Sequence, residues 1–183
     1  DNGWSGLSLT QMSIGYETTC TPLQTLAFYN AVANNGVMVR PQFVQEVRRS
    51  GQIIEKAQPI VLRPKICKDE TLAQCRKMME GVTEEGSGVR LRTQSGGSGD
   101  NRWTGYPYMF TNPIAGKTGT SQNQSDGWFI GMVPNLVTGV WVGCEDRSAR
   151  FKGITYGQGA TAALPIWGYM MKKCYEDKDL LIS

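Results

Sequence analysis

One short stretch of the chain, residues 116–120, combines a lysine, two threonines and two glycines in the order G-K-T-G-T. An extended strand of this composition exposes the Lys117 ammonium, the hydroxyls of Thr118 and Thr120, and open backbone N–H groups. Each of these groups can donate a hydrogen bond to a carboxylate. The stretch therefore indicates a strand that binds an acidic ligand. Without other support, we would favour a solvated lysine at a sheet edge and threonines that are ordinary strand formers.

The chain contains no histidine. This absence excludes Ser-His-Asp and Cys-His catalysis, H-E-x-x-H zinc hydrolysis and any histidine metal centre within the chain. Proton transfer would have to use Lys, Glu, Asp, Tyr or Cys. The cysteines are scattered and form no C-x-x-C pair, so we expect no metal, no cofactor and mostly small buried side chains. They are Cys20, Cys67, Cys75, Cys144 and Cys174.

Length and composition are those of one ordinary domain. The 183 residues are 40% hydrophobic and 19% charged, with a net charge of +3. This charge is too small to argue for nucleic acid as a partner, and no apolar run reaches the roughly 18–20 residues that span a bilayer. Because the chain starts at Asp1 without a methionine, the lack of a visible signal peptide is uninformative.

Capping and turn residues predict the elements of the first half. Thr21, followed by Pro22 and Gln24, predicts the start of a helix with a capping box, and Gly36 its end. A β pattern at 43–48 and 53–54, separated by Ser50-Gly51, predicts a hairpin. A second helix is expected at about 69–80. The Gly- and Ser-rich stretch 86–101 predicts a flexible surface loop that does not pack, although an engineered linker would look similar.

The second half predicts three strands and a closing helix. Strands are expected at 114–120, 128–133 and 137–143, and a turn at Pro134-Asn135 makes the last two antiparallel. The final helix is expected at about 161–175. Four aromatic residues on these elements, Trp128, Phe129, Trp141 and Trp167, are expected in the core. The charged residues Glu145, Asp146, Arg147 and Arg150 are expected in a solvated loop.

Three apparent motifs are ruled out by the residues around them. Residues 116–118 end like a phosphate-binding P-loop, but Thr111 stands where that motif requires its first glycine. The G-x-G-x-x-A spacing at 157–162 lacks room for the second parallel strand of a dinucleotide fold. The triplet S-x-N at 121–123 follows the lysine motif, and we interpret it as a coincidence.

Several segments in a fixed order resemble the C-terminal part of the transpeptidase domain of class A, bifunctional penicillin-binding proteins. Residues 116–120 resemble that family's third motif, K-T-G-T, and three further blocks surround it. The blocks are 13–16 with 21–24 and 31–36, then 126–131 with 137–143, and 159–163 with 165–167. The resemblance implies an α/β (α+β) fold, in which helices back an antiparallel sheet, as in the serine β-lactamases. On this basis we expect residues 1–183 to be an incomplete part of one transpeptidase domain.

The resemblance also implies roles for the lysine motif. Lys117 and Thr120 would be catalytic, and Thr118, Gly119 and Thr120 would bind substrate. The family joins peptidoglycan stem peptides through a serine acyl-enzyme, which β-lactams also form. The Lys117 ammonium would assist proton transfer, the two hydroxyls would hold the substrate carboxylate, and the Thr120 N–H would be one oxyanion donor. Gly119 would let the peptide approach.

Two of the family's three motifs are missing from the sequence. No serine is followed three residues later by lysine, and no S-x-N precedes the lysine motif. We therefore expect both motifs upstream of Asp1, together with a glycosyltransferase region and a membrane anchor on the extracytoplasmic or periplasmic face. The isolated chain is predicted to be inactive. A serine β-lactamase, a class B transpeptidase and a non-catalytic β-lactam sensor remain alternatives.

Overall fold

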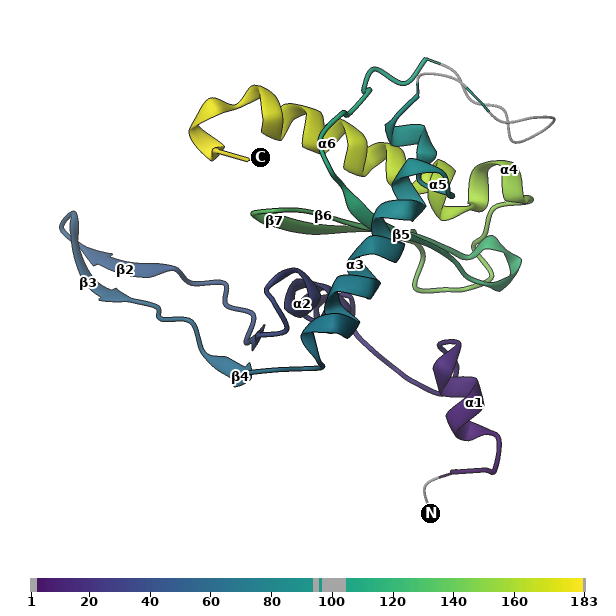
Figure 1. The fold of residues 1–183 in the computed structure, drawn as a ribbon, viewed down its shortest axis with the longest axis horizontal. Coiled ribbons are helices and arrows are strands. Elements are labelled where there is room, and N and C mark those ends of the chain that lie inside the picture. Colours follow the sequence, from purple (N-terminus) through teal and green to yellow (C-terminus); the bar gives the residue numbers. More distant parts are fainter. Residues whose placement is uncertain (1–2, 94–95, 97–104, 183) are drawn as a thin grey trace.

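A three-stranded antiparallel sheet lies at the centre of the computed structural model, which describes residues 3–93, 96 and 105–182 (Figure 1). Its strands are β5 (Ala115–Thr120), β6 (Asp126–Val133) and β7 (Leu136–Gly143), in the order β5-β6-β7. The predicted strands and the turn at Pro134-Asn135 are confirmed. The expected fold, an antiparallel sheet backed by helices, is confirmed as well.

Short helices and two small β ladders surround this sheet. The helices are α1 (Ser8–Ser13), α2 (Pro22–Ala33), α3 (Asp69–Glu84), α4 (Ile154–Gly157), α5 (Gly159–Ala162) and α6 (Leu164–Glu176). The 3-10 turns are η1 (Val89–Leu91), η3 (Gln122–Gln124) and η4 (Lys178–Leu180). The strand β1 (Met38–Val39) pairs with β4 (Val61–Arg63), and β2 (Glu46–Arg49) pairs with β3 (Gln52–Lys56) as the predicted hairpin.

The main core lies between the sheet and α6. Phe129 of β6 and Trp167 of α6 are both fully buried, with ring centroids 5.3 Å apart in an edge-to-face arrangement. This close approach requires Gly131, because a Cβ there would lie 2.5 Å from the Trp167 ring. Burial of such aromatic rings removes a large apolar area from water and fixes α6 on this face of the sheet.

The opposite face of the sheet is covered by α2 (Figure 1). The predicted capping box is present: the Thr21 side chain accepts from the Gln24 N–H, and the Gln24 side chain accepts from the Thr21 N–H. At the other end of the helix, Arg76 of α3 donates to the carbonyls of Val32 and Ala33. Backbone groups at the N-terminus of α2 are thus satisfied by the local capping box, and those at its C-terminus by the distant Arg76 side chain.

The helix α3 lies beside β5 and is fixed to its beginning. Thr83 is fully buried, and its hydroxyl donates to the Ile114 carbonyl at 2.5 Å. The chain then turns through η1, where Leu91 is also fully buried in the main core. The expectation that the stretch 86–101 does not pack is therefore wrong for its first part. Residues 94, 95 and 97–101 lie outside the described residues.

Three further expectations need correction. None of the five cysteines is fully buried, and Cys20 and Cys144 are exposed. Trp141 is 43% exposed rather than part of the core, and Trp128 is only partly buried. The closing helix is divided at Ala163 into α5 and α6, because Pro165 lacks an N–H and suits a new first turn better than a helix interior.

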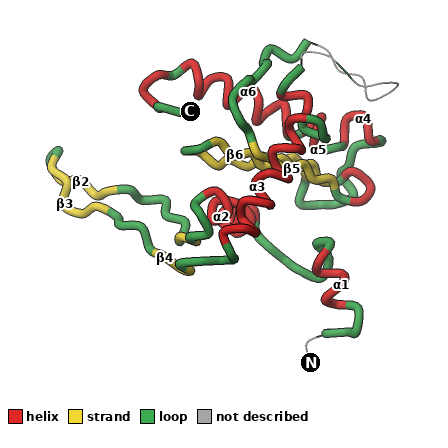
Figure 2. Tube along the Cα trace, in the orientation of Figure 1, coloured by secondary structure: helices red, strands yellow, loops and turns green. Residues whose placement is uncertain are grey.

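Two segments project away from the sheet (Figure 2). The hairpin β2–β3 extends to one side, and α1 lies on another side of the molecule, joined to α2 by an extended connection. Both carry exposed apolar side chains, among them Leu9, Ile14, Phe43 and Ile54. Within the described ranges, no helix has the length and apolar character needed to cross a membrane.

Candidate active site

The lysine motif lies on β5, which pairs with β6 and has no other strand partner among the described residues. The Ser121 N–H donates to the Asp126 carbonyl at 3.0 Å, so this pair is a hydrogen-bonded one. Such pairs alternate along an antiparallel ladder, which directs the backbone groups of Lys117 and Gly119 toward β6. The N–H and C=O groups of Thr118 and Thr120 therefore point to the outer edge of the sheet.

The side chains of the motif divide between the two faces. Residues directly opposite each other in the ladder share a face, and Lys117 is opposite Ile130, whereas Thr118 is opposite Phe129. Lys117 therefore lies on the face that α2 covers, and Thr118 and Thr120 lie on the face of α5 and α6. The Lys117 side chain is exposed, and its Nζ donates to the Thr118 carbonyl at 2.7 Å, across the outer edge.

The two threonine hydroxyls have different partners. The Gly159 N–H donates to Thr120 Oγ1 at 3.0 Å, which leaves the hydroxyl its own proton to donate. Thr118 Oγ1 lies 2.6 Å from the hydroxyl oxygen of Ser87, in the turn between α3 and η1. The structure thus brings Lys117, Thr118 and Thr120 together on one strand and adds Ser87 from a distant segment.

The glycines near the motif have packing reasons of their own. A Cβ on Gly119 would lie 3.1 Å from the Trp128 Cβ on the neighbouring strand. A Cβ on Gly159 would lie 2.3 Å from the carbonyl oxygens of both Gly119 and Trp128. The start of α5 therefore packs directly on the β5–β6 ladder, and a side chain at Gly159 would push it away.

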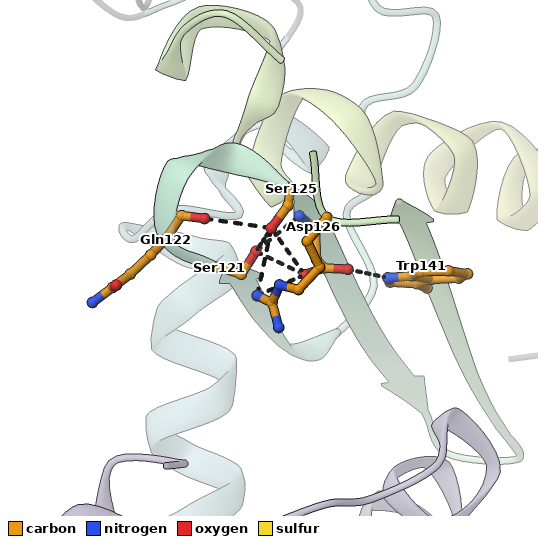
Figure 3. A network of polar contacts seen from close by, with 6 residues as sticks. Ser121, Gln122, Ser125, Asp126 and Trp141 are labelled. Atoms are coloured by element: carbon orange, nitrogen blue, oxygen red, sulfur yellow. Dashed lines mark hydrogen bonds and ion pairs between the residues drawn. The ribbon is translucent and has the colours of Figure 1, made fainter. Parts of the chain in front are cut away.

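A polar network closes the β5–β6 connection (Figure 3). The Asp126 carboxylate accepts from the Ser121 hydroxyl at 2.8 Å and from the Trp141 indole N–H at 3.0 Å. The Ser125 hydroxyl and the Arg147 guanidinium lie 3.4 Å from the same carboxylate. Ser121, the first residue of the apparent S-x-N triplet, therefore has a role in holding the connection.

The surroundings of the Asp126 carboxylate favour its charged form. Burial alone would raise the pKa of Asp126, but hydrogen bonds from Ser121 and Trp141 and the charge of Arg147 outweigh burial and lower it. Its side chain is 19% exposed. Asp126 is therefore an anion at neutral pH, and it orders the connection that follows Thr120.

Two polar contributors to this region were missed from the sequence, Ser87 and Asp126. Ser87 is 31 residues from Thr118, and Asp126 is 15 residues from Trp141. Neither contact follows a helical or strand spacing, so no sequence pattern could predict it. The one signal for Ser87 in the sequence is its place between Gly86 and Gly88, a pattern that is also typical of a flexible loop.

Comparison with known proteins decides which family this strand and its surroundings represent. The family model described as "Penicillin binding protein transpeptidase domain" matches residues 1–161. The chain belongs to this family. The resemblance on which the sequence analysis depended is thereby confirmed.

Curated relatives of the transpeptidase family agree. Penicillin-binding protein 1A of Aquifex aeolicus is 32% identical over 163 residues, covering 87% of this chain and 20% of the relative. Penicillin-binding protein 1A of Neisseria gonorrhoeae is 29% identical over 171 residues, covering 91% of this chain and 19% of the relative. The chain therefore spans about a fifth of the length of these relatives.

Solved structures share the fold of this transpeptidase-domain chain. The crystal structure of penicillin-binding protein 1A from Haemophilus influenzae aligns with a TM-score of 0.69 at 22% identity, covering 87% of this chain and 27% of that one. An imipenem acyl-enzyme complex of penicillin-binding protein A from M. tuberculosis aligns with a TM-score of 0.62 at 22% identity. That alignment covers 90% of this chain and 34% of that one.

Proposed function

We propose that this chain is part of a peptidoglycan D,D-transpeptidase that cross-links stem peptides and is acylated by β-lactams. The observation that carries this proposal is the outer edge of β5, which pairs with no other strand among the described residues. There, Lys117, Thr118 and Thr120 present an ammonium, two hydroxyls and backbone N–H groups. The chain's membership of the transpeptidase family also supports the proposal. The rest of the parent protein supplies the nucleophilic serine.

In the proposed reaction, the serine oxygen attacks the carbonyl carbon of the D-Ala-D-Ala peptide bond. The C–N bond breaks, the terminal D-Ala leaves as an amine after accepting a proton, and an acyl-enzyme ester remains. The amine of a second stem peptide then attacks the ester and releases the serine. Within this chain, which has no histidine, Lys117 is the group proposed to assist these proton transfers, through its positive field and its hydrogen bonds.

The outer edge of β5 suits an extended peptide. A stem peptide can add to this edge as an extra strand, because the backbone groups of Thr118 and Thr120 point that way. The Thr120 N–H then stabilises the oxyanion, and the nucleophile's own N–H acts as the second donor. The hydroxyls of Thr118 and Thr120 bind the terminal carboxylate of the peptide, or the carboxylate of a β-lactam.

The parent protein is proposed to be longer than this chain. Its relatives are about five times as long as the part that this chain matches. We propose an upstream glycosyltransferase region and a membrane anchor, with the transpeptidase domain on the extracytoplasmic or periplasmic face. We further propose that residues 1–183 all belong to one transpeptidase domain.

The role of Lys117 is tested by Lys117→Ala in the full-length parent. The second-order rate constant for acylation by a fluorescent penicillin should fall by roughly 10²-fold, a typical loss for a proton-transfer group. Lys56→Ala, which removes an exposed lysine from β3, serves as the matched control and should acylate at the wild-type rate. Unchanged acylation of Lys117→Ala would refute the role given to this lysine. Rapid hydrolysis of the wild-type acyl-enzyme would instead favour a β-lactamase.

A further inference from the structure

The hydroxyl of Ser87 is the least expected neighbour of the lysine motif. It lies 2.6 Å from Thr118 Oγ1, so the two side chains share one hydrogen bond. Ser87 is exposed and sits outside β5, at the end of α3. A hydroxyl at this place can set the direction in which Thr118 donates.

The backbone around Ser87 is held rigidly. The Gly86 N–H donates to the Gly81 carbonyl at 3.0 Å, and the Gly88 N–H donates to the Val82 carbonyl at 2.8 Å. Both glycines lie in close packing: a Cβ on Gly86 would lie 2.9 Å from Val82 Cα, which would force a shift, and one on Gly88 would lie 3.1 Å from the Val82 carbonyl oxygen, a tight contact. These hydrogen bonds and close contacts stabilise the turn that carries Ser87.

The turn is also fixed relative to β5. On one side of it, the buried Thr83 hydroxyl bonds to the Ile114 carbonyl, immediately before the strand. On the other side, Leu91 is buried in the main core, and its carbonyl accepts from the Phe110 N–H at 3.0 Å. Anchors on both sides hold the Ser87 hydroxyl at a set position beside Thr118.

We infer that Ser87 is a positioning residue for the carboxylate-binding hydroxyl of Thr118, an inference that rests on the proposed function. When the Ser87 hydroxyl donates to Thr118 Oγ1, it occupies one of the two acceptor positions of Thr118 and leaves the Thr118 proton free to be donated to the ligand. A chain of two hydroxyls also polarises the terminal O–H, which strengthens its bond to an anion. Ser87 thus acts through Thr118 on ligands that carry a carboxylate.

The inference is tested in the full-length parent with benzylpenicillin and its methyl ester, which lacks the free carboxylate. Ser87→Ala should slow acylation by benzylpenicillin about three- to tenfold, the worth of one hydrogen bond, and leave acylation by the ester within twofold. Ser148→Ala, at an exposed serine whose hydroxyl the proposal does not use, is the control and should match wild type with both compounds. Equal slowing with both compounds would assign Ser87 a merely structural role and overturn the inference.

A double-mutant cycle separates action through Thr118 from direct contact with the ligand. The double variant of Ser87→Ala and Thr118→Val should be no slower than Thr118→Val alone. Additive losses would overturn the positioning role. If Ser87→Ala does not fold, Ser87→Thr and Ser87→Val compare the presence and absence of a hydroxyl at equal volume, and only Ser87→Thr should keep the wild-type rate.

The outcome for the wild-type parent distinguishes the two proposals. If the wild type is acylated normally and Ser87→Ala matches it, the positioning role fails and the proposed function stands. If the wild-type parent is acylated by neither compound, the proposed function itself fails and the inference fails with it.

Discussion

The hydroxyls of Thr118 and Thr120 on β5 have different hydrogen-bond partners. The Thr120 hydroxyl accepts from the first N–H of α5, whereas the Thr118 hydroxyl meets Ser87 at the end of α3. Each hydroxyl is therefore oriented by a different element, although only Gly119 separates the two residues. In the proposed site, a bound carboxylate would meet two hydroxyls, each of which is oriented by a different element.

Beyond Thr120, the connection to β6 adopts an uncommon backbone. Asn123 and Gln124 both have positive φ, at 59° and 55°. Non-glycine residues rarely occupy this region, and they remain there when surrounding bonds over-determine the loop. The Asp126 network supplies such bonds on both sides of the connection.

Asp126→Asn should destabilise the domain in a pH-dependent way. The folded state lowers the pKa of Asp126, so its charge contributes stability above the unfolded pKa, near 4, and that stability is lost as pH falls through the folded pKa. We expect a loss of about 1–2 kcal/mol at pH 7 that shrinks below about pH 4. Thermal unfolding of the full-length parent at several pH values measures this difference.

The control for this prediction is Glu55→Gln, which removes an exposed carboxylate from β3. It should leave the melting temperature close to that of wild type at every pH. A loss of stability in Asp126→Asn that stays constant from pH 7 to pH 3 would contradict the assigned role of the charge.

At the scale of elements, local chemistry was sufficient to predict most helices and strands. The capping box at Thr21, the turn at Pro134-Asn135 and the Ser50-Gly51 hairpin all follow from residues close in sequence. Pro165 was expected in or near the first turn of the closing helix and lies in the first turn of α6, but the separation of α5 from α6 was missed. Helix α1 and the pairing of β1 with β4 had no strong local pattern.

Contacts between distant segments could not be predicted in this way. Leu91 enters the core and Ser87 meets Thr118 because α3 lies against β5, and no spacing in the sequence encodes that approach. The same limit explains Trp141, whose aromatic side chain suggested a core position. Its indole N–H instead bonds to Asp126 at a half-exposed edge of the sheet.

The attachment of α3 to β5 should depend on the hydroxyl of Thr83. Thr83→Val keeps the volume but leaves the buried Ile114 carbonyl without this donor, a loss that costs about 1–3 kcal/mol. Thermal or denaturant unfolding of the full-length parent measures the change. Thr83→Ser retains the hydroxyl and should recover at least half of the loss; equal stability of the Val and Ser variants would disprove this role.

At the scale of the whole molecule, many large apolar side chains are exposed. Phe43 on the way to β2 is 87% exposed and Leu9 of α1 is 70% exposed, in segments that project from the sheet. Apolar surface of this extent on a protein usually contacts another segment or a partner. The number of these exposed side chains accords with the finding that the chain spans about a fifth of the length of its relatives.

At the same scale, the lysine motif is proposed to form one side of a site that other parts of the parent complete. The strand provides an ammonium, hydroxyls and an N–H, but no serine in the chain stands three residues before a lysine. Nucleophile and carboxylate-binding strand must therefore come from different parts of the proposed parent. The isolated chain should consequently form no covalent adduct with a penicillin.

The most direct test is to map the site of acylation by mass spectrometry. The full-length parent is treated with benzylpenicillin and digested, and the isolated chain of residues 1–183 is treated in parallel. We predict one adduct in the parent, on a serine outside residues 1–183, and none in the isolated chain. An adduct on any serine within residues 1–183 would contradict the account.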